Sequence, residues 1–360
     1  IPLRLVGSEM CIRDSSLIKG MKVYLVEPID DINQLKNQFQ PYIDAGLDLS
    51  VGPYVSERNK GFSEQDLIRI GNEYDAVIGM SREKFTRDII MASDRLKMIG
   101  KTGIGIDHID VNAATEKGIV VTNTPNLNAL SVSEHAISLM LALLKKLPKV
   151  DAHLRAGYWR DGSTLADEVY HNTIGIVGFG NIGRGVAKRL QGWDCTLIAY
   201  DPYVTQEQAD ALGWNVKMVD WETLFTTSDA ITIHTPLNEE TRGFVGEKEL
   251  KMMKKTAVLV NTARGPIVNR DTLNNALRSG EIAGAGIDTH VPEPVGSDYP
   301  LLDLHENVIL TTHNAGWARP ALCRLAEMAA KNTIETLSGN ICENVCNPEV
   351  EKLWRTRFGY

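Results

Sequence analysis

The sequence predicts an α/β protein built from two doubly wound lobes, each with a parallel sheet. Two observations lead to this class. Short apolar segments alternate with helical stretches from Met21 onward, and a glycine-rich turn follows one apolar segment in the middle of the chain. Because that turn lies mid-chain, we expect one lobe to be formed by both chain ends and the other to be inserted between them.

The elements of the first lobe follow from the spacing of apolar residues. Apolar segments predict strands at 23–26, 47–51, 76–78, 96–99 and 119–122, with helices between them at 32–39, 64–70, 86–92 and 113–117. A long helix at 129–147 follows, whose apolar stripe is formed by Val132, Ala136, Leu139, Met140 and Leu143. It bridges to the second lobe.

The second lobe continues the same alternation. Strands are expected at 173–177, 195–200, 230–233, 257–260, 285–287 and 308–310, with helices that include 247–253 and 271–278. A final helix at 319–337 leads into residues 344–350.

Composition narrows the class of partner. The chain has 360 residues, of which 43% are hydrophobic and 23% charged, with a net charge of −8. The basic residues are scattered among acids, so nucleic acid and membrane are not expected as partners. The five cysteines include one close pair, Cys342 and Cys346, with no histidine nearby. We therefore expect no metal site and a reduced, cytoplasmic location.

The first twenty residues stand apart from the rest. Residues 5–15 resemble the translation of an adapter used in sequencing libraries, and they show neither a signal-peptide nor a transit-peptide pattern. We expect residues 1–20 to be a non-native leader and Met21 to be the native start.

The glycine-rich turn has the form G-x-G-x-x-G, with Gly178, Gly180 and Gly183 after an apolar segment and Asn181 and Ile182 inside the turn. This pattern is a dinucleotide-binding fingerprint, in which the backbone approaches a pyrophosphate at a helix N-terminus. Asp201 ends the next apolar segment, where an acid binds a ribose, and no Arg lies nearby to accept a 2′-phosphate. NAD is therefore predicted over NADP.

Three chemically distinct residues each follow a predicted strand of the second lobe: Arg264, Glu293 and His313. Ligands of open α/β sheets bind at the carboxyl ends of the strands. Reduction of a 2-oxo acid needs a cation for the carboxylate and ketone, and an acid that protonates the developing alkoxide. Arg264 and His313 suit these roles, and a carboxylate such as Glu293 would hold the His tautomer and favour the imidazolium.

Together with the closing segment 344–350, these motifs resemble, in order, those of the D-isomer-specific 2-hydroxyacid dehydrogenase family over essentially all of residues 21–350. The resemblance implies a Rossmann NAD-binding domain at 124–313, inserted into a flavodoxin-like substrate domain at 21–123 and 314–360. It also implies a homodimer that associates through the NAD-binding domain, and a small 2-oxo or 2-hydroxy acid as substrate.

The resemblance assigns further residues. It implies that the backbone of Ile104 and Gly105 binds the substrate carboxylate, that Asp288 holds the nicotinamide amide, and that Thr235 and Pro236 flank the adenosine. Other expected contacts are Thr262, Ala263 and Gly316 with the cofactor, and Met80 and Ser81 with the substrate.

The chain departs from the family at three positions. Met80 stands where many relatives carry an Arg that grips a phosphorylated substrate, which favours an unphosphorylated one. His290 stands where an aromatic residue is usual and Thr312 where a Pro is usual, and we expect neither to contact the proposed chemistry. The remaining histidines, including His135, have no motif context and are interpreted as ordinary surface or structural residues, with His234 interpreted as structural.

Four alternatives stay open. The chain could act on 3-phosphoglycerate, or could oxidise phosphite on the same scaffold; formate oxidation is disfavoured, because formate enzymes carry Gln at the position of Glu293. In a different class, the C-terminal-binding-protein corepressors share the fold and the Arg, Glu and His, and act as NADH-sensitive binding proteins. Assay of NADH oxidation with a panel of 2-oxo acids separates a dehydrogenase from a binding protein, and phosphite oxidation needs its own assay.

Overall fold

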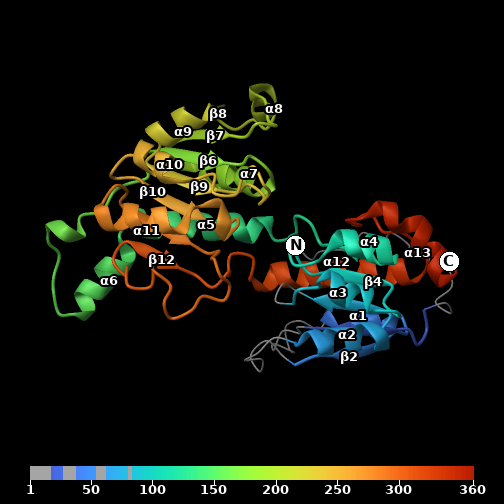
Figure 1. Cartoon of the computed structure of the whole chain (residues 1–360). Helices are drawn as coiled ribbons and strands as arrows, with labels where there is room; N and C mark the ends of the chain where they lie inside the picture. The colour runs from blue at the N-terminus through green and yellow to red at the C-terminus, as the bar shows by residue number, and fades with distance from the viewer. Residues whose placement is uncertain (1–17, 27–37, 54–61, 80–82) are drawn as a thin grey trace. The chain divides into compact units, whose positions relative to one another are not determined.

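The computed structural model describes residues 18–26, 38–53, 62–79 and 83–360. The chain divides into two compact units, one comprising Ile1–Asn128 and Arg319–Tyr360 and the other Ala129–Ala318. Each change of unit falls at the first residue of a helix, α5 (Ala129–Leu144) or α12 (Arg319–Leu337). The predicted α/β class with two parallel sheets is confirmed (Figure 1).

In the first unit the described residues form a five-stranded parallel sheet in the order β2-β1-β3-β4-β5. This is the flavodoxin-like order of doubly wound sheets. Its strands are β1 (Lys22–Leu25), β2 (Asp48–Val51), β3 (Ala76–Gly79), β4 (Met98–Lys101) and β5 (Val120–Thr122).

In the second unit they form a seven-stranded parallel sheet in the order β12-β11-β10-β9-β6-β7-β8. The first strand of this sheet along the chain is β6, and the next two, β7 and β8, extend the sheet on one side of it. The chain then returns to place β9 on the other side of β6, which is the Rossmann arrangement. Its strands are β6 (Thr173–Val177), β7 (Thr196–Tyr200), β8 (Val216–Met218), β9 (Ala230–Ile233), β10 (Val258–Asn261), β11 (Gly284–Ile287) and β12 (Val308–Leu310).

Helices cover both faces of each sheet, because consecutive strand residues point to opposite faces and both sets are apolar. In the first unit, Val77 packs with α2 (Glu64–Glu73), α3 (Arg87–Met91) and α4 (Val111–Lys117). Ala76 and Ile78 pack instead with α1 (Gln40–Asp44), α12 and α13 (Glu351–Phe358).

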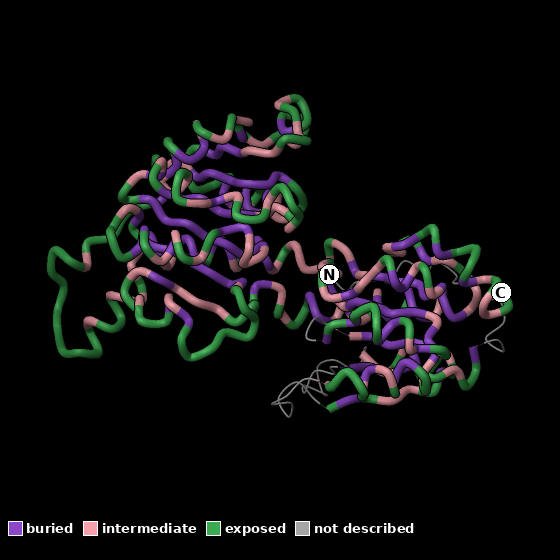
Figure 2. Tube along the Cα trace, viewed as in Figure 1, coloured by how far each residue is buried: buried purple, intermediate pink, exposed green. Residues whose placement is uncertain are grey.

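The second unit is built in the same way. Leu259 packs on the face covered by α9 (Trp221–Thr227), α10 (Glu247–Met252) and α11 (Arg270–Ser279). Val258 and Val260 pack on the face covered by α5, α7 (Asn181–Arg189) and α8 (Gln206–Asp210). The strands are accordingly buried along most of their length (Figure 2).

The structure corrects the predicted elements at three places. The helix expected at 129–147 ends at Leu144, and the chain turns through Lys146, whose φ is +48°, before α6 (Leu147–Arg155) begins with Pro148 in its first turn. Strand β8 and helix α13 were not predicted. The helix expected at 32–39 falls largely on residues outside those described.

Ile18, which the sequence analysis placed in the leader, is buried in the core of the first unit. Residues 1–17 lie outside the described part of the chain. Across the described ranges, no helix has both the length and the apolarity that a membrane crossing requires.

Candidate active site

The predicted site residues of the second unit gather at one edge of its sheet. Gly178 follows β6, Thr235 follows β9, Thr262 follows β10, Asp288 follows β11 and Thr311 follows β12. In a parallel sheet these carboxyl ends lie at the same edge. Because β6 pairs with both β7 and β9, the strand order reverses beside the glycine-rich turn, which is where such sheets bind ligands.

The three glycines of the turn are required for different reasons. Gly178 has φ +88°, and a Cβ there would lie 2.9 Å from the backbone of His234 and Thr235. A Cβ on Gly183 would lie 2.1 Å from the carbonyl oxygen of Gly178. Gly180 faces open space instead: nothing lies within 4 Å of its Cβ position, and as N-cap of α7 it supplies no side-chain cap. The backbone thus leaves room for an anion at the start of α7.

Asp201 is fixed beside this turn. Its Oδ2 accepts a hydrogen bond from the N–H of Phe179 at 2.8 Å, and its Oδ1 accepts one from the N–H of Tyr203 at 2.9 Å. The carboxylate therefore joins the end of β7 to the glycine-rich turn, and each oxygen keeps a lone pair for a ribose hydroxyl.

Several buried polar atoms along the same edge lack a partner within the described part of the chain. They are the hydroxyl oxygens of Thr235, Thr262 and Thr289 and the Nδ1 atom of His234. Burial lowers the pKa of His234 to about 3, so this ring is neutral at physiological pH. Buried polar groups are normally satisfied. Unpartnered atoms of this kind fit an edge that binds a polar ligand, and Pro236 and Ala263 adjoin two of them.

Arg264 lies in a turn that Asn261 shapes. The Asn261 side chain accepts from the N–H of Ala263 at 3.0 Å and donates to the carbonyl oxygen of Arg264 at 2.9 Å. The half-buried Arg264 donates through Nη1 to the carbonyl oxygen of Ala263 at 2.8 Å. The following Gly265 packs against the neighbouring loop, since a Cβ there would lie only 2.4 Å from the carbonyl oxygen of His290.

Glu293 and His313 form an ion pair in the structure. The Nδ1 atom of His313 lies 2.9 Å from Oε2 of Glu293, and the N–H of His290 donates to Oε1 of Glu293 at 2.7 Å. Burial alone would raise the pKa of the Glu293 carboxyl, but the hydrogen bond and charge of His313 and the His290 N–H outweigh it and lower the pKa. The side chains of His313 and Glu293 are 43% and 37% exposed, so the pair is open to a ligand.

The loop that carries His313 is held by Asp288. This carboxylate is fully buried and accepts hydrogen bonds from the Thr311 hydroxyl at 2.5 Å and from the N–H groups of Asn314 and Ala315 at 2.7 and 3.0 Å. The backbone N–H of His313 donates to the Asp288 carbonyl at 2.8 Å, and His313 has φ +55°. A non-glycine residue in this region is strained and persists because its surroundings hold it.

Sequence reasoning missed two histidines of this region. His135 on α5 lies with Nε2 3.1 Å from the Thr311 hydroxyl and 3.7 Å from Oδ1 of Asp288, although no motif marks it. His290 was expected to play no part in the site, but its N–H binds Glu293 and its Nε2 lies 2.7 Å from the carbonyl oxygen of Thr311. Its unusual residue type was the available signal.

The remaining predicted residues lie elsewhere. Ile104 and Gly105 belong to the first unit and follow β4, in a loop where Asn123 donates to the carbonyl oxygen of Ile104 at 2.9 Å. Met80 and Ser81 lie outside the described residues. Gly316 follows the His313 loop, and its carbonyl accepts from the N–H of Ala318 at 3.0 Å.

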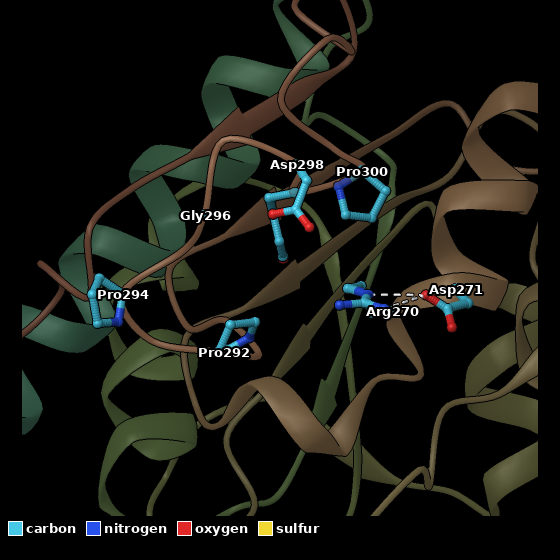
Figure 3. Close-up of a pocket in the computed structure, with 8 residues that line it drawn as sticks. Arg270, Asp271, Pro292, Pro294, Gly296, Asp298 and Pro300 are labelled. Carbon is cyan, nitrogen blue, oxygen red and sulfur yellow. Dashed lines mark hydrogen bonds and ion pairs between the residues drawn. The ribbon is translucent and has the colours of Figure 1, made fainter.

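A cavity of about 500 Å³ lies on the loop that carries Glu293 (Figure 3). It is lined by Arg270, Asp271, Pro292, Pro294, Gly296, Asp298, Tyr299 and Pro300. None of the predicted site residues lines it. In the described ranges no group of His, Cys, Asp and Glu side chains could hold a metal ion.

Comparison with known proteins shows which family the chain is similar to. Residues 137–315 match the NAD binding domain model of the D-isomer specific 2-hydroxyacid dehydrogenases. The chain is 37% identical over 295 residues to a glyoxylate reductase of Korarchaeum cryptofilum, covering 81% of this chain and 88% of the relative. It is also 37% identical over 334 residues to a D-3-phosphoglycerate dehydrogenase of Archaeoglobus fulgidus, covering 92% of this chain but 60% of that relative.

A solved structure shows the same architecture. The NAD-dependent formate dehydrogenase of Staphylococcus aureus, in complex with NAD, superimposes with a TM-score of 0.79 at 31% identity, covering 90% of this chain and 98% of the other.

Proposed function

Because this chain belongs to the D-isomer-specific 2-hydroxyacid dehydrogenase family, we propose that it is an NAD-dependent oxidoreductase that interconverts a small 2-oxo acid and its D-2-hydroxy acid. The observation that carries the proposal is the Glu293–His313 ion pair, 2.9 Å apart at the sheet edge that also carries Arg264. A cation, a carboxylate and an imidazole in this relation are what ketone reduction requires.

NADH held by the glycine-rich turn and Asp201 would supply the hydride that reduces C2 of the oxo acid. Arg264 binds the substrate carboxylate and polarises the ketone, and His313 gives a proton to the oxygen as the C2–H bond forms. Since Nδ1 of His313 is engaged by Glu293, Nε2 is the nitrogen that delivers this proton. Glu293 holds the ring and stabilises its positive charge.

NAD binding is proposed at the glycine-rich edge. The open space at Gly180, with Asn181, Ile182 and Gly183 in the first turn of α7, suits a pyrophosphate, and Asp201 suits the ribose. We assign Thr235 and Pro236 to the adenosine side, and Thr262, Ala263, Asp288 and Gly316 to the remainder of the cofactor. The buried, unpartnered hydroxyls of Thr235 and Thr262 support this assignment.

The first unit is proposed as the substrate domain and the second as the NAD-binding domain. Ile104 and Gly105 would offer backbone N–H groups to the substrate carboxylate, with Met80 and Ser81 near its side chain. An unphosphorylated substrate such as glyoxylate or hydroxypyruvate is our first choice, because Met80 replaces a phosphate-binding Arg. A 3-phosphoglycerate activity is the second choice, supported by the relative from Archaeoglobus fulgidus.

The test is NADH oxidation by the purified protein with glyoxylate, hydroxypyruvate, pyruvate, longer 2-oxo acids and 3-phosphohydroxypyruvate. We expect turnover with the unphosphorylated acids and the highest kcat/KM among them. More efficient turnover of 3-phosphohydroxypyruvate would reverse the order of the two substrates. The protein could instead bind NADH, turn over no oxo acid and fail to reduce NAD with phosphite. That result would favour a binding protein of the corepressor class.

We also propose a homodimer that forms through α6. This nine-residue helix has no buried residue, and Leu147, Val150 and Leu154 are exposed on it. Trp159 and Leu165, which follow it, are each 75% exposed. A helix this short is marginal in water unless its apolar face is packed. The same segment of a second copy of this chain offers a matching apolar surface. Figure 2 shows the exposed course of this segment.

The dimer is tested by light scattering of the wild type and of Leu154→Asp. The wild type should have twice the monomer mass, and the variant should shift toward monomer while remaining folded. A monomeric wild type would refute the proposal.

A cytoplasmic location is proposed from the cysteines, since within the described residues no disulfide joins Cys195, Cys342 or Cys346.

A further inference from the structure

We propose that His290 is a positioning residue that holds the loops of Arg264, Glu293 and His313 in register. The inference rests on the proposed function, because it concerns the same three residues. His290 directly follows Asp288 and Thr289 beyond β11, between the loops that follow β10 and β12. It contacts all three loops, two through its backbone and one through its ring.

The backbone of His290 connects Glu293 to the Arg264 turn. Its N–H donates to Oε1 of Glu293 at 2.7 Å, which leaves Oε2 for His313. On its other side, the carbonyl oxygen lies so close to Gly265 that a Cβ there would be 2.4 Å away. The position of Glu293 relative to Arg264 therefore depends on where the His290 backbone lies.

The ring of His290 connects the same loop to the His313 segment. Nε2 lies 2.7 Å from the carbonyl oxygen of Thr311, which can only accept, so Nε2 carries the hydrogen. In the neutral ring Nδ1 is then an acceptor, and it lies 3.2 Å from the hydroxyl of Tyr299. Burial raises the pKa of Tyr299, so this hydroxyl stays protonated and donates. The two rings meet edge to face, with centroids 5.4 Å apart.

The hydrogen bonds form a relay that an apolar aromatic ring could not make. It runs from the Tyr299 hydroxyl to His290 and on to Thr311, whose own hydroxyl donates to the buried Asp288 at 2.5 Å. Asp288 in turn accepts hydrogen bonds from the backbone N–H groups of His313 and Asn314. With Phe at position 290, the Thr311 carbonyl and the Tyr299 hydroxyl would each lose this partner, and the Glu293 loop could shift against His313.

The experiment compares His290→Phe, which keeps a ring and the backbone contacts, with His290→Gln, whose amide can still donate to Thr311. We expect kcat to fall roughly tenfold in the Phe variant and less in the Gln variant, because misplacement of catalytic groups by about 1 Å can cost about a hundredfold. The KM for NADH should change less than kcat, because the glycine-rich turn at Gly178–Gly183 is not touched. Asp298→Ala, an exposed residue of the same loop, is the matched control and should keep wild-type kcat.

The pH profile separates positioning from general destabilisation. A less firmly held Glu293 side chain stabilises the His313 imidazolium less. The alkaline limb of the pH profile, where kcat falls as pH rises, should therefore move to lower pH in His290→Phe. In a Glu293→Gln background the same substitution should leave the limb unmoved. A loss of melting temperature with an unmoved limb in both backgrounds would show a merely structural role and would overturn the proposal.

A measurement without turnover keeps the inference separate from the proposed function. The ring of His313 can be titrated by NMR in the protein without cofactor, and His290→Phe should shift its midpoint to lower pH, as Glu293→Gln does. If the wild type reduces no oxo acid, the function is refuted while this titration still tests His290. If His290→Phe is too unstable to purify, Tyr299→Phe, which removes the donor to Nδ1, should shift the midpoint in the same direction, and an unchanged midpoint there would refute the relay.

Discussion

Gly265→Ala tests whether close contact between two loops sets the geometry of the site. A Cβ at this position would lie 2.4 Å from the carbonyl oxygen of His290 and 2.6 Å from its carbonyl carbon, whereas ordinary contacts of a Cβ begin at 3.4 Å. One loop must therefore move by about 3.4 − 2.4 = 1.0 Å. Gly265 does not have a positive φ, so alanine meets no backbone strain and the effect is steric alone.

That displacement would separate Arg264 from the Glu293–His313 pair. A misplacement of about 1 Å costs roughly a hundredfold in rate when it affects groups that must converge on one substrate, so we expect kcat to fall by about that factor. The dissociation constant of NADH should change less than kcat, because the glycine-rich turn at Gly178–Gly183 is not touched, although Thr262 and Ala263 lie in the same turn as Gly265. The assay is NADH oxidation under saturating 2-oxo acid, with NADH affinity measured separately by fluorescence titration.

Gly192→Ala is the control. Nothing lies within 4 Å of its Cβ position and its φ is not positive, so this variant should keep wild-type kcat and stability. A kcat for Gly265→Ala within about twofold of the wild type, with an unchanged melting temperature, would refute the claim that the two loops are held in fixed contact.

Asp201→Ala should narrow the preference for NADH over NADPH, because it removes the charge that repels a 2′-phosphate; equal kcat/KM for both cofactors in the wild type would contradict this. Glu293→Gln should move the alkaline limb of kcat to lower pH, since reduction needs a protonated His313 and ionised Glu293 stabilises that proton, while His313→Ala should lower kcat by roughly 10²–10⁴ and leave NADH binding intact. Trp354→Ala should cost about 3–5 kcal/mol of unfolding free energy in the first unit, because this fully buried ring stacks on Tyr360; denaturant unfolding measures the loss, and a change below about 1 kcal/mol would be inconsistent with it.

The strands were predicted well from the sequence because most are buried on both faces. β9 and β12 match their predicted ranges at both ends, since each is a short apolar run bounded by polar residues or turns. β8 was missed because it is short, lies at the edge of its sheet and includes an exposed Lys217. The break after α5 was missed because apolar residues continue at helical spacing across Lys146, and periodicity carries no information on its left-handed backbone.

Within the site, the sequence predicted residue types but not the contacts that hold them. Glu293 and His313 were paired correctly, because each follows a strand and their chemistry is complementary. The link from His135 to Thr311 spans 176 residues and depends on α5 packing beside β11 and β12, which no local pattern encodes. The bond from His290 to Thr311 likewise requires β11 and β12 to be neighbours.

The proposed catalytic pair and the group that holds its loop differ in burial. The side chains of His313 and Glu293 are 43% and 37% exposed, whereas the carboxylate of Asp288, which organises the His313 loop, has no exposure. An exposed ion pair is by itself weak and free to move. Here the buried carboxylate of Asp288 fixes the geometry of the pair. It accepts three hydrogen bonds, so it cannot shift without leaving their donors unpaired. The exposed pair can therefore be open to a ligand and still be held in one arrangement.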